Sequence, residues 1–461
     1  MSAPILAVIG GGQLARMMHE EASALGIHLR ALVEASDGST GQVIVDAPVG
    51  AADDEAAVRA LLEGRDRPGP DTGAPGAVRT VTGGRAEALT FEHEHQDHRL
   101  LRALEAEGVA VRPGPEALEL ARDKLAMRRA MDEAGLPQPA WAEVDGEVAQ
   151  MRRLIVAFAA EHGWPVVLKT PRGGYDGHGV LLVDDLDQLD APPAASWLAQ
   201  TAAARALEEC AENGTEGCVG DAAGGQAQDR AGAGGSLGGG AVTSLLVEQA
   251  VPFTRELAVL LARSPSGQVA VWPVAQTLQV GGMCAEVVVP APGLAADAMA
   301  EAERIGRTVA ERFGVTGVLA VEMFAVEEAG GTRLAVNELA MRPHNSGHWT
   351  QDGSVTSQFA QHMRAVLDLP LGATTPTAAA TVMVNVIGGA QEPGSRALDE
   401  AMALDPQARI HLYGKAWRPG RKLGHVNLTV SPGGPADVEA ALARARAVAA
   451  VLSGEPQERG R

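Results

Sequence analysis

The sequence predicts a mixed protein, α/β at its start and α+β further on, that is divided into several domains. Its 461 residues exceed the ~100–200 residues that one domain usually holds. The first part alternates short apolar runs with amphipathic stretches, as parallel α/β domains do. The later part carries β-branched runs separated by short turns, which is typical of antiparallel sheets.

The first predicted domain spans residues 1–112. PILAVI at 4–9 predicts a strand, Gly10 to Gly12 a tight turn, and 13–25 an amphipathic helix. The elements predicted after these are strands at 28–33 and 88–94, a helix near 53–63 and a Pro/Gly-rich loop at 64–77.

Residues 113–372 form the second predicted domain, and residues 373–461 a small mixed one. A helix at 116–134 ends at Gly135, and strands at 164–170 and 179–185 are joined as a hairpin by a glycine-rich loop. An insertion is predicted at 204–241, of low complexity from 211 onward. The further elements are strands at 245–251, 256–263, 268–274, 285–291, 317–326 and 333–341 and helices at 296–313 and 354–368.

Composition excludes several classes of protein. The net charge is −20 and no stretch is strongly basic, so we expect no nucleic-acid-binding face. No apolar run reaches the roughly 18 residues of a membrane span, and the three cysteines contain no C-x-x-C. The N-terminus lacks a basic leader region. We therefore expect a cytoplasmic protein that binds neither nucleic acid nor membrane.

Lysine is scarce in this chain. Arginine carries most of the positive charge, so the remaining lysines mark positions that need a compact ammonium group rather than a planar fork. Three of them lie in glycine-bearing segments, 167–180 and 413–425, which we interpret as anion-binding loops. Only four of the 38 basic residues are lysine, namely Lys124, Lys169, Lys415 and Lys422.

Glu322 and Glu338 lie in two strand-like runs joined by EEAGGT. In an antiparallel hairpin, pairing them centres the turn on Gly330, and alternation places Glu338 on one face with Val336. Their Cβ atoms would then lie about 4.5–5.5 Å apart, and the carboxylates would repel. A hard cation such as Mg²⁺ would neutralise them. The alternative is a looser turn that leaves both carboxylates in solvent.

Lys169 closes its predicted strand just before four glycines in seven residues, 173–179. Such a loop lets backbone N–H groups cradle phosphates, while the lysine adds a point charge. The lysine precedes the glycines, so the pattern is not a P-loop. An ordinary glycine-rich hairpin turn is the alternative.

The first turn also fits a dinucleotide-binding fingerprint. Gly10-x-Gly12-x-x-Ala15 follows a strand, and Glu34 lies where a ribose-binding acid is expected. An NAD-dependent oxidoreductase is therefore an alternative, although nothing downstream resembles a nicotinamide site.

Two more polar clusters accompany these features. RPHNSGH at 342–348 follows the Glu338 strand directly and places an arginine and two imidazoles beside the predicted metal. Lys415, Arg421 and Lys422 form a basic cluster suited to a phosphate monoester. The alternatives are a helix-capping turn and a solvated basic loop.

Taken together, these motifs resemble the ATP-grasp enzymes, and among them the N5-carboxyaminoimidazole ribonucleotide synthases of purine biosynthesis. The resemblance covers nearly the whole chain outside 64–77 and 204–241. It rests on GGGQLARM, TFEHEH, KTPRGGYDGHG, VEQAVPFTREL, NELAMRPHNSGHW, SQFAQHMRAVLDLPLG and YGKAWRPGRKLGHVN.

The resemblance implies an ATP-grasp fold with a Rossmann-like domain at 1–112, an ATP-grasp domain at 113–372 whose lid covers about 140–250, and a C-terminal domain at 373–461. It implies ATP as cofactor and Mg²⁺ or Mn²⁺ on Glu322 and Glu338. The implied ATP contacts are Lys124, Lys169, Gly174, Tyr175, Asp176, Gly177, His178, Gly179, Val180, Glu248, Gln249, Ala250, Val251, Glu256, Gln279, Asn337 and Glu338. The implied substrate contacts are Gln13, Glu92, Arg342, His344, Lys415, Arg421 and Lys422, and the implied catalytic residues are Asp176, Arg342 and Lys415.

The resemblance further implies that bicarbonate and ATP carboxylate 5-aminoimidazole ribonucleotide through carboxyphosphate, in a homodimeric enzyme. Three positions depart from the family pattern: Lys124 replaces an arginine, Gln279 a histidine that often contacts ATP, and Met341 a proline. The sequence also leaves open a formate-using glycinamide ribonucleotide transformylase and a nucleotide-binding regulatory protein without turnover.

Overall fold

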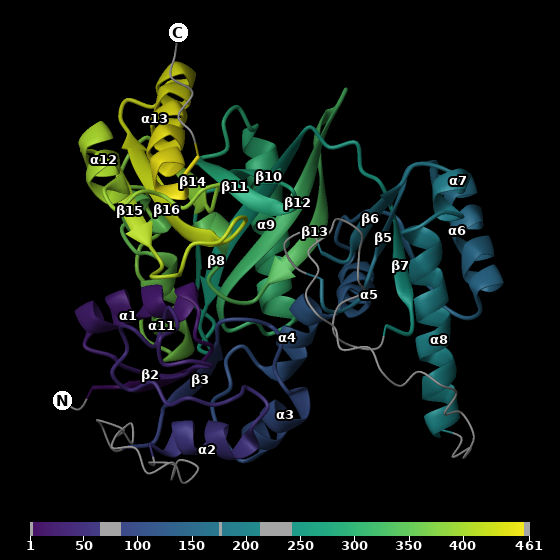
Figure 1. The fold of residues 1–461 in the computed structure, drawn as a ribbon, viewed down its shortest axis with the longest axis horizontal. Coiled ribbons are helices and arrows are strands. Elements are labelled where there is room, and N and C mark those ends of the chain that lie inside the picture. Colours follow the sequence, from purple (N-terminus) through teal and green to yellow (C-terminus); the bar gives the residue numbers. More distant parts are fainter. Residues whose placement is uncertain (1–2, 65–83, 175–177, 213–241, 456–461) are drawn as a thin grey trace.

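The computed structural model describes residues 3–64, 84–174, 178–212 and 242–455. In these ranges the strands form sheets of three, nine and four strands. Figure 1 shows the first sheet at the bottom, the largest in the centre and upper left, and the third at the right. The first sheet is parallel and the other two are antiparallel, which confirms the mixed α/β and α+β class. Every helix in the described ranges is too short or too polar to cross a bilayer.

The three-stranded sheet has the order β2-β1-β3. β1 is buried on both faces, since Leu6 and Val8 pack with α1 while Ala7 and Ile9 pack with α2. The predicted strand–turn–helix alternation is confirmed, and most of the Pro/Gly-rich loop lies outside the described residues. The elements are β1 (Ile5–Ile9), α1 (Gln13–Leu25), β2 (His28–Leu32), α2 (Glu55–Glu63), β3 (Ala88–Phe91) and α3 (His98–Ala106).

The central sheet has the order β13-β12-β8-β10-β11-β14-β16-β15, with β9 beside β8. It runs without a break past residue 373, because β11 pairs with β14. Its strands are β8 (Arg255–Arg263), β9 (Val269–Val271), β10 (Ala275–Val280), β11 (Met283–Val289), β12 (Gly317–Glu328), β13 (Gly331–Ala340), β14 (Ala380–Ile387), β15 (Arg409–Leu412) and β16 (Lys422–Val430). The helices that accompany it are α9 (Ala296–Arg312), α10 (Thr350–Gly353), α11 (Gln358–Val366), α12 (Ala397–Leu404) and α13 (Pro435–Ser453), with a short 3₁₀ turn η1 (Asn345–Gly347).

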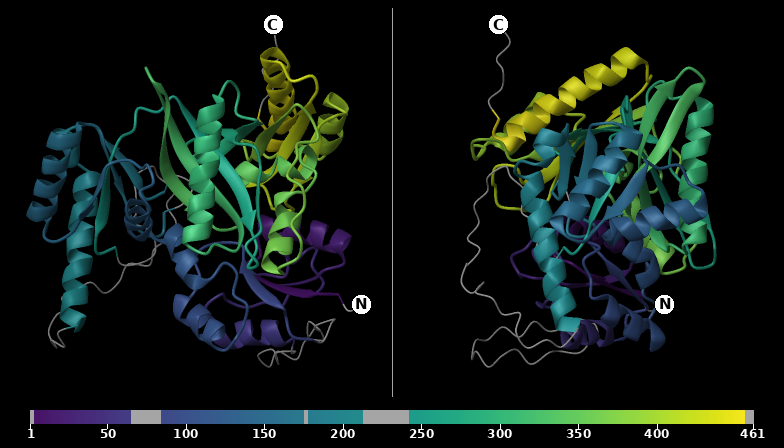
Figure 2. Two further views of the ribbon diagram at one scale, coloured as in Figure 1. Left: turned by 180° about the vertical axis from the view of Figure 1, so that it is seen from behind. Right: turned by 90° about the vertical axis from the view of Figure 1, so that its right-hand side faces the viewer.

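The four-stranded sheet, which we call the lid sheet, stands to one side of the central sheet in Figure 1 and in the left view of Figure 2. Its order is β4-β7-β5-β6, and the predicted hairpin is β5–β6. The first nine residues of the predicted 204–241 insertion continue a helix, α8, whereas 213–241 lie outside the described residues. The elements are β4 (Trp141–Val144), α6 (Val148–His162), β5 (Val166–Lys169), β6 (Val180–Val183), α7 (Leu186–Leu189), α8 (Ala194–Glu212) and β7 (Leu245–Gln249).

The single helix predicted at 116–134 is wrong, because Asp123 divides it into α4 (Pro115–Arg122) and α5 (Lys124–Ala134). Asp123 has an extended backbone, and its carboxylate accepts hydrogen bonds from the N–H groups of Leu125 (2.9 Å) and Ala126 (3.0 Å). An aspartate that caps in this way starts a new helix. Lys124 is consequently the first residue of α5.

One helix begins later than predicted, and one strand of the central sheet was missed. The helix expected at 354–368 begins at Gln358, because Ser357 caps it by accepting the Ala360 N–H at 3.1 Å. β10 was not predicted at all. Its sequence, AQTLQV, exposes Leu278 and Val280 by about half, so it lacks the apolar alternation of a half-buried strand.

Candidate active site

The predicted pairing of Glu322 with Glu338 is confirmed. From the hairpin tip to Met323–Val336, however, the pairs follow a register that would place Asn337 opposite Glu322. A β-bulge next to Glu322 takes up Asn337, so that Glu338 becomes the partner. The bulge presents Asn337 and Glu338 in succession at the place where strands β12 and β13 face the lid sheet.

The bulge corrects two details of the prediction. Glu328 pairs with Gly331, so the turn consists of Ala329 and Gly330 rather than being centred on Gly330. Val336 packs in the core on the face opposite Glu338, and not on the same face. Both details assumed one uninterrupted register, which the extra residue breaks.

Charge is unevenly divided between the two carboxylates. Burial and the facing Glu338 raise the pKa of Glu322 to about 8. Burial acts to raise the pKa of Glu338 as well, but the ammonium groups of Lys124 and Lys169 outweigh it and lower that pKa. Lys124 Nζ lies 2.8 Å from Glu338 Oε1, and 39 % of the Glu338 side chain is exposed. The pair thus carries one negative charge near neutral pH, and a further cation would let both groups ionise.

The two oxygen-bearing side chains suit Mg²⁺, which prefers carboxylate, phosphate and water ligands. No group of three His, Cys, Asp or Glu in the described ranges is arranged to hold a metal ion. A metal ion held by Glu322 and Glu338 could take its other ligands from substrate phosphates and water.

Lys169 lies at the end of β5 with its ammonium turned toward the bulge. Its Nζ is 2.8 Å from Glu248 Oε2 on β7 and 3.2 Å from Asn337 Oδ1. Glu248 is buried and also accepts from Arg128 Nε at 2.6 Å. Burial acts to raise the pKa of Glu248, but Lys169 and Arg128 lower it to about 2. The Glu248 side chain thus holds two cations, and its backbone lies inside the lid sheet, paired with Trp141 of β4 and Val167 of β5.

The glycine-rich loop returns tightly onto β5. Gly179 has φ +70°, and a Cβ there would lie 2.4 Å from Thr170 Oγ1. A Cβ on Gly174 would lie 2.7 Å from the carbonyl oxygen of His178. Both positions therefore require glycine. Val180 begins β6, and the predicted residues Tyr175, Asp176 and Gly177 lie outside the described residues.

Glu256 and Gln279 come together on neighbouring strands, β8 and β10. The backbone N–H of Gln279 donates to the Glu256 carboxylate, and burial raises the pKa of that carboxyl. The contact uses the Gln279 backbone, so glutamine in place of the family's histidine leaves it unchanged. Gln249, Ala250 and Val251 follow at the end of β7 and are half-buried.

The predicted substrate residues gather between the three-stranded sheet and the C-terminal loop. Lys415 Nζ donates to Gln13 Oε1. Burial lowers the Lys415 pKa, while the nearby Glu92 carboxylate acts to raise it. Lys415 also lies 5.8 Å from the centre of the Tyr413 ring. These contacts join α1 to the loop before β16.

Arg342 and His344 connect this region to the carboxylate pair. Arg342 Nε lies 2.9 Å from Glu94 Oε1, and His344 Nε2 lies 3.5 Å from Glu322 Oε1. Burial, Arg342 and Lys422 lower the pKa of His344 to about 3, so its ring is neutral. Arg421 and Lys422, at the start of β16, are half-buried.

The first turn does not have room for a dinucleotide pyrophosphate. Glu92 Oε1 accepts the Leu14 N–H at 2.8 Å, and its other oxygen accepts the Gly12 N–H. A Cβ on Gly10 or Gly12 would lie within 2.5 Å of Glu92. The protein's own carboxylate therefore occupies the anion position at the start of α1, which argues against the NAD alternative.

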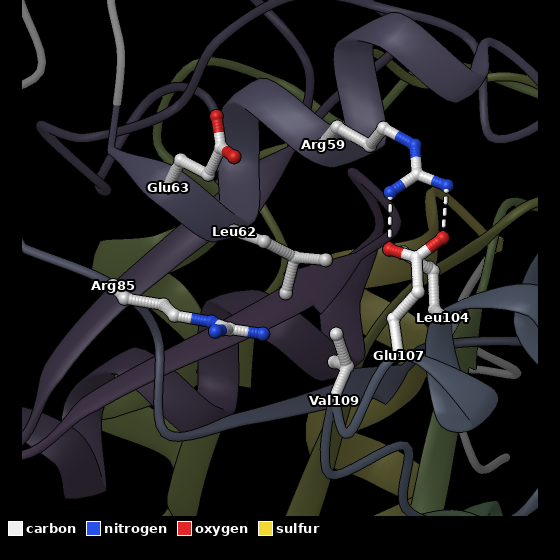
Figure 3. Close-up of a pocket in the computed structure, with 7 residues that line it drawn as sticks. All are labelled: Arg59, Leu62, Glu63, Arg85, Leu104, Glu107 and Val109. Carbon is white, nitrogen blue, oxygen red and sulfur yellow. Dashed lines mark hydrogen bonds and ion pairs between the residues drawn. The ribbon is translucent and has the colours of Figure 1, made fainter.

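A separate pocket of about 250 Å³ lies between α2 and α3, away from all the predicted site residues. Figure 3 shows that Arg59 and Glu107 face each other across its rim. They form a two-bond ion pair at 2.6 and 2.8 Å, so the charge of this guanidinium is already neutralised. We assign no role in the reaction to this pocket.

Sequence reasoning missed Arg128 and Glu94. Arg128 lies four residues after Lys124, on the same face of α5, and this spacing was a usable signal. Glu94 belongs to the TFEHEH motif, but its contact with Arg342 joins segments that are far apart in the sequence.

Three family matches support an ATP-grasp architecture with an N-terminal and a C-terminal domain. The family described as ribonucleotide synthetase preATP-grasp domain matches residues 4–67, and the ATP-grasp domain matches 226–359. The phosphoribosylaminoimidazole carboxylase C-terminal domain matches residues 381–432. The three matches follow the order of the three sequence regions along the chain.

Individual relatives cover most of the chain. The N5-carboxyaminoimidazole ribonucleotide synthase of Mycobacterium bovis is 42% identical over 92% of this chain and 83% of its own length. The crystal structure of the corresponding synthetase from Thermus thermophilus has 31% identity and a TM-score of 0.72, covering 98% of this chain and 99% of that one. The Aspergillus clavatus synthase in complex with ADP and 5-aminoimidazole ribonucleotide has 26% identity and a TM-score of 0.74, covering 98% and 99%. From the site geometry and these relatives together, we conclude that the chain belongs to the N5-carboxyaminoimidazole ribonucleotide synthases, which are ATP-grasp ligases.

Proposed function

We propose that the enzyme joins bicarbonate to the 5-amino group of 5-aminoimidazole ribonucleotide and converts ATP to ADP and phosphate, in purine biosynthesis. Bicarbonate attacks the γ-phosphorus of ATP, which gives carboxyphosphate and ADP. The amine then takes up the carboxyl group, directly or as CO₂ released from carboxyphosphate, and phosphate departs. The products are N5-carboxyaminoimidazole ribonucleotide, ADP and inorganic phosphate.

One observation carries this proposal. The carboxylate pair Glu322–Glu338 lies between two basic groups of different origin. Lys124 and Lys169 approach it from the side of α5 and the lid sheet. Arg342 and Lys422 act on Glu322 by their charge from the region next to the first domain, where Arg342 pairs with Glu94 and the neutral His344 contacts Glu322. An acidic centre with two separate groups of cations near it is suited to holding a polyphosphate and a second anion against each other.

Glu322 and Glu338 would hold Mg²⁺, or Mn²⁺ in its place. When bound, the metal would neutralise phosphate charge and orient the γ-phosphate. Lys124 and Lys169 bind the phosphates from the other side, and the glycine-rich loop 174–180 covers them. The segment 248–251 holds adenine through its backbone and side chains, and Glu256 holds the ribose, beside Gln279. Asn337 stays at the phosphates, where it already accepts from Lys169.

Gln13, Glu92, Lys415, Arg421 and Lys422 bind the ribonucleotide. Support comes from the contact between Lys415 and Gln13, which joins the basic C-terminal loop to the first domain. Burial and the basic side chains nearby lower the pKa of Lys415, and a bound phosphate would act in the opposite direction by favouring the charged ammonium.

Arg342 and His344 lie between the two substrates and orient bicarbonate and the amine. Arg342 carries the positive charge, since His344 is neutral. Asp176, on the lid loop, is our candidate for moving the amine proton as the loop closes and excludes water.

The deciding experiment measures ADP release with each substrate left out in turn. We expect rapid release only when ATP, Mg²⁺, bicarbonate and 5-aminoimidazole ribonucleotide are all present, with one ADP per ribonucleotide consumed. Release that needs formate in place of bicarbonate would support the transformylase alternative. An absence of ribonucleotide-dependent turnover would support the regulatory alternative and contradict our proposal.

We propose in addition that the enzyme is a homodimer with three domains, 1–112, 113–372 and 373–461. The three successive family matches support the division. Sedimentation equilibrium would test the dimer, and a mass of one chain, 47.5 kDa, would contradict it.

A further inference from the structure

Arg128 is a fully buried arginine on α5 whose contacts are with residues of the active site. Its side chain has no exposed surface. It lies one helical turn after Lys124 and therefore shares the face of α5 that Lys124 turns toward Glu338. Figure 1 places α5 between the lid sheet and the central sheet. This helix thus faces both halves of the ATP site.

On the side of the lid sheet, Arg128 holds the partner of Lys169. Arg128 Nε donates to Glu248 Oε1 at 2.6 Å, while Lys169 Nζ lies 2.8 Å from Glu248 Oε2. One buried carboxylate therefore joins an α5 guanidinium to the β5 ammonium. Each oxygen of Glu248 binds a different cation. The contact with Arg128 therefore fixes the orientation of the carboxylate, and this orientation sets the position of the oxygen that binds Lys169.

On the side of the central sheet, the same guanidinium binds the bulge. Arg128 Nη1 donates to the Val336 carbonyl oxygen at 2.8 Å, and Nη2 donates to that of Asn337 at 3.1 Å. β13 is the edge strand of the sheet, so these carbonyls have no neighbouring strand to bind. The N–H of Val336 is bound on the same edge by the Pro137 carbonyl oxygen at 2.8 Å. Arg128 and Pro137 thus bind the backbone of Val336 and Asn337, the two residues directly before Glu338.

We infer that Arg128 is a positioning residue for ATP, which sets Lys169 and the Asn337–Glu338 bulge at one fixed separation across the cleft. The inference rests on the proposed function of those residues as phosphate and metal ligands. The planar fork has three directed nitrogens and reaches a carboxylate and two carbonyls at once, which a lysine ammonium on a single point cannot do. Loss of the fork would leave each ligand in place but free to shift relative to the others.

The first test replaces Arg128 by lysine, which keeps the charge beside Glu248 and removes the contacts to the bulge carbonyls. We expect the Kd for ADP with Mg²⁺, measured by calorimetry, and the KM for ATP to rise at least tenfold. The KM for the ribonucleotide should stay within twofold. If the Kd and KM for ATP stay within twofold while the melting temperature falls, Arg128 is only a buried structural ion pair and the inference is overturned.

Arg30 provides a matched control. It is also fully buried, its Nε lies 2.9 Å from Asp46 Oδ2, and its Nη1 donates to the carbonyls of Leu61 (2.7 Å) and Gly84 (3.3 Å). Because these partners belong to the first domain, Arg30→Lys should lower the melting temperature without changing the Kd for ADP by more than twofold. A tenfold change in that Kd for Arg30→Lys would show that any buried arginine loss weakens nucleotide binding, which would overturn the inference.

A second variant keeps the test decisive if Arg128→Lys does not fold. Glu248→Gln alone is compared with Arg128→Met/Glu248→Gln, in which neither member of the buried ion pair is charged. These two proteins both lack the Glu248 carboxylate and differ only in the Arg128 guanidinium, which carries the two bonds to the bulge carbonyls. We expect the double variant to bind ADP at least fivefold more weakly than Glu248→Gln. Equal affinity within twofold would overturn the inference. The binding assay needs no turnover, so it stays informative even if the wild-type protein shows no ribonucleotide-dependent ADP release.

Discussion

Lys169→Arg keeps the charge in the most constrained position of the ATP site. The Lys169 side chain is only 7 % exposed, and its ammonium approaches both Glu248 Oε2 at 2.8 Å and Asn337 Oδ1 at 3.2 Å. An ammonium has three N–H donors, so one is left for a phosphate oxygen. Arginine is longer and its donors lie in one plane. In the same space it cannot serve both protein partners and still present an N–H to the phosphate.

The magnitude follows from the loss of one such contact. A hydrogen bond to a charged group contributes about 1.5–3 kcal/mol. Expressed as transition-state binding, this corresponds to a fall of roughly 12- to 150-fold in kcat/KM for ATP. We expect the KM for the ribonucleotide to stay near that of the wild type, because Lys169 contacts no residue that we assign to that substrate.

Lys415→Arg is the matched comparison at the other end of the site. Lys415 binds Gln13, and burial lowers its pKa. We expect this variant to raise the KM for the ribonucleotide by a similar factor and to leave the KM for ATP nearly unchanged. Both are measured from initial rates of ADP release, with one substrate varied at saturating levels of the others. If both variants match the wild type within twofold, the scarcity of lysine has no functional meaning and our reasoning is refuted.

Three more predictions test other parts of the site and the chain. Glu338→Gln should abolish ATP turnover with a melting temperature within about 3 °C of the wild type, because the lost ion pair with Lys124 is offset by the loss of the charge that keeps Glu322 from ionising. Normal turnover and Mg²⁺ dependence would remove the metal assignment. Gly10→Ala should lower the free energy of unfolding, measured by urea denaturation, by about 1–3 kcal/mol, because Gly10 has a φ of +133° and the new Cβ would lie 2.5 Å from the Glu92 Cβ. An unchanged free energy of unfolding would contradict this close approach. Replacing residues 213–240 by a short linker should keep kcat within about twofold of the wild type. Low-complexity Gly/Ala sequence buries little apolar surface, and the entropy cost of closing a loop rises only slowly with its length. Loss of most activity would show that the segment is needed.

Much of the fold was predictable because local patterns determine it. The alternation of apolar runs with amphipathic stretches predicted the parallel sheet and its helices, since both periods are properties of single segments. The hairpin of Glu322 and Glu338 was predictable for the same reason. Asp123 was the missed local signal, as its capping role divides what otherwise looks like one helix.

Parts of the site were not predictable, because their partners come from distant segments. Glu248 belongs to a recognised motif, yet its side chain is held by Arg128 and Lys169 from two other elements. Likewise, Gly10 and Gly12 fit a dinucleotide fingerprint, but the carboxylate that fills the turn comes from the residue after β3. A sequence motif shows which residues are neighbours along the chain, but it does not show which side chains from distant segments will contact them.

The sequence by itself determined the mixed class, the hairpin with its two glutamates and the position of scarce lysines in glycine-bearing segments, because each is a matter of residue type and short-range spacing. Only the tertiary structure decided the register at Glu338. With the observed two-residue turn, an unbroken hairpin would have placed Asn337 opposite Glu322, and the bulge that changes this lies where α5 binds the outer edge of β13. Long-range contacts of this kind leave no periodic trace in the sequence, since burial and charge balance among α5, the lid sheet and the central sheet arise only when all three are packed together.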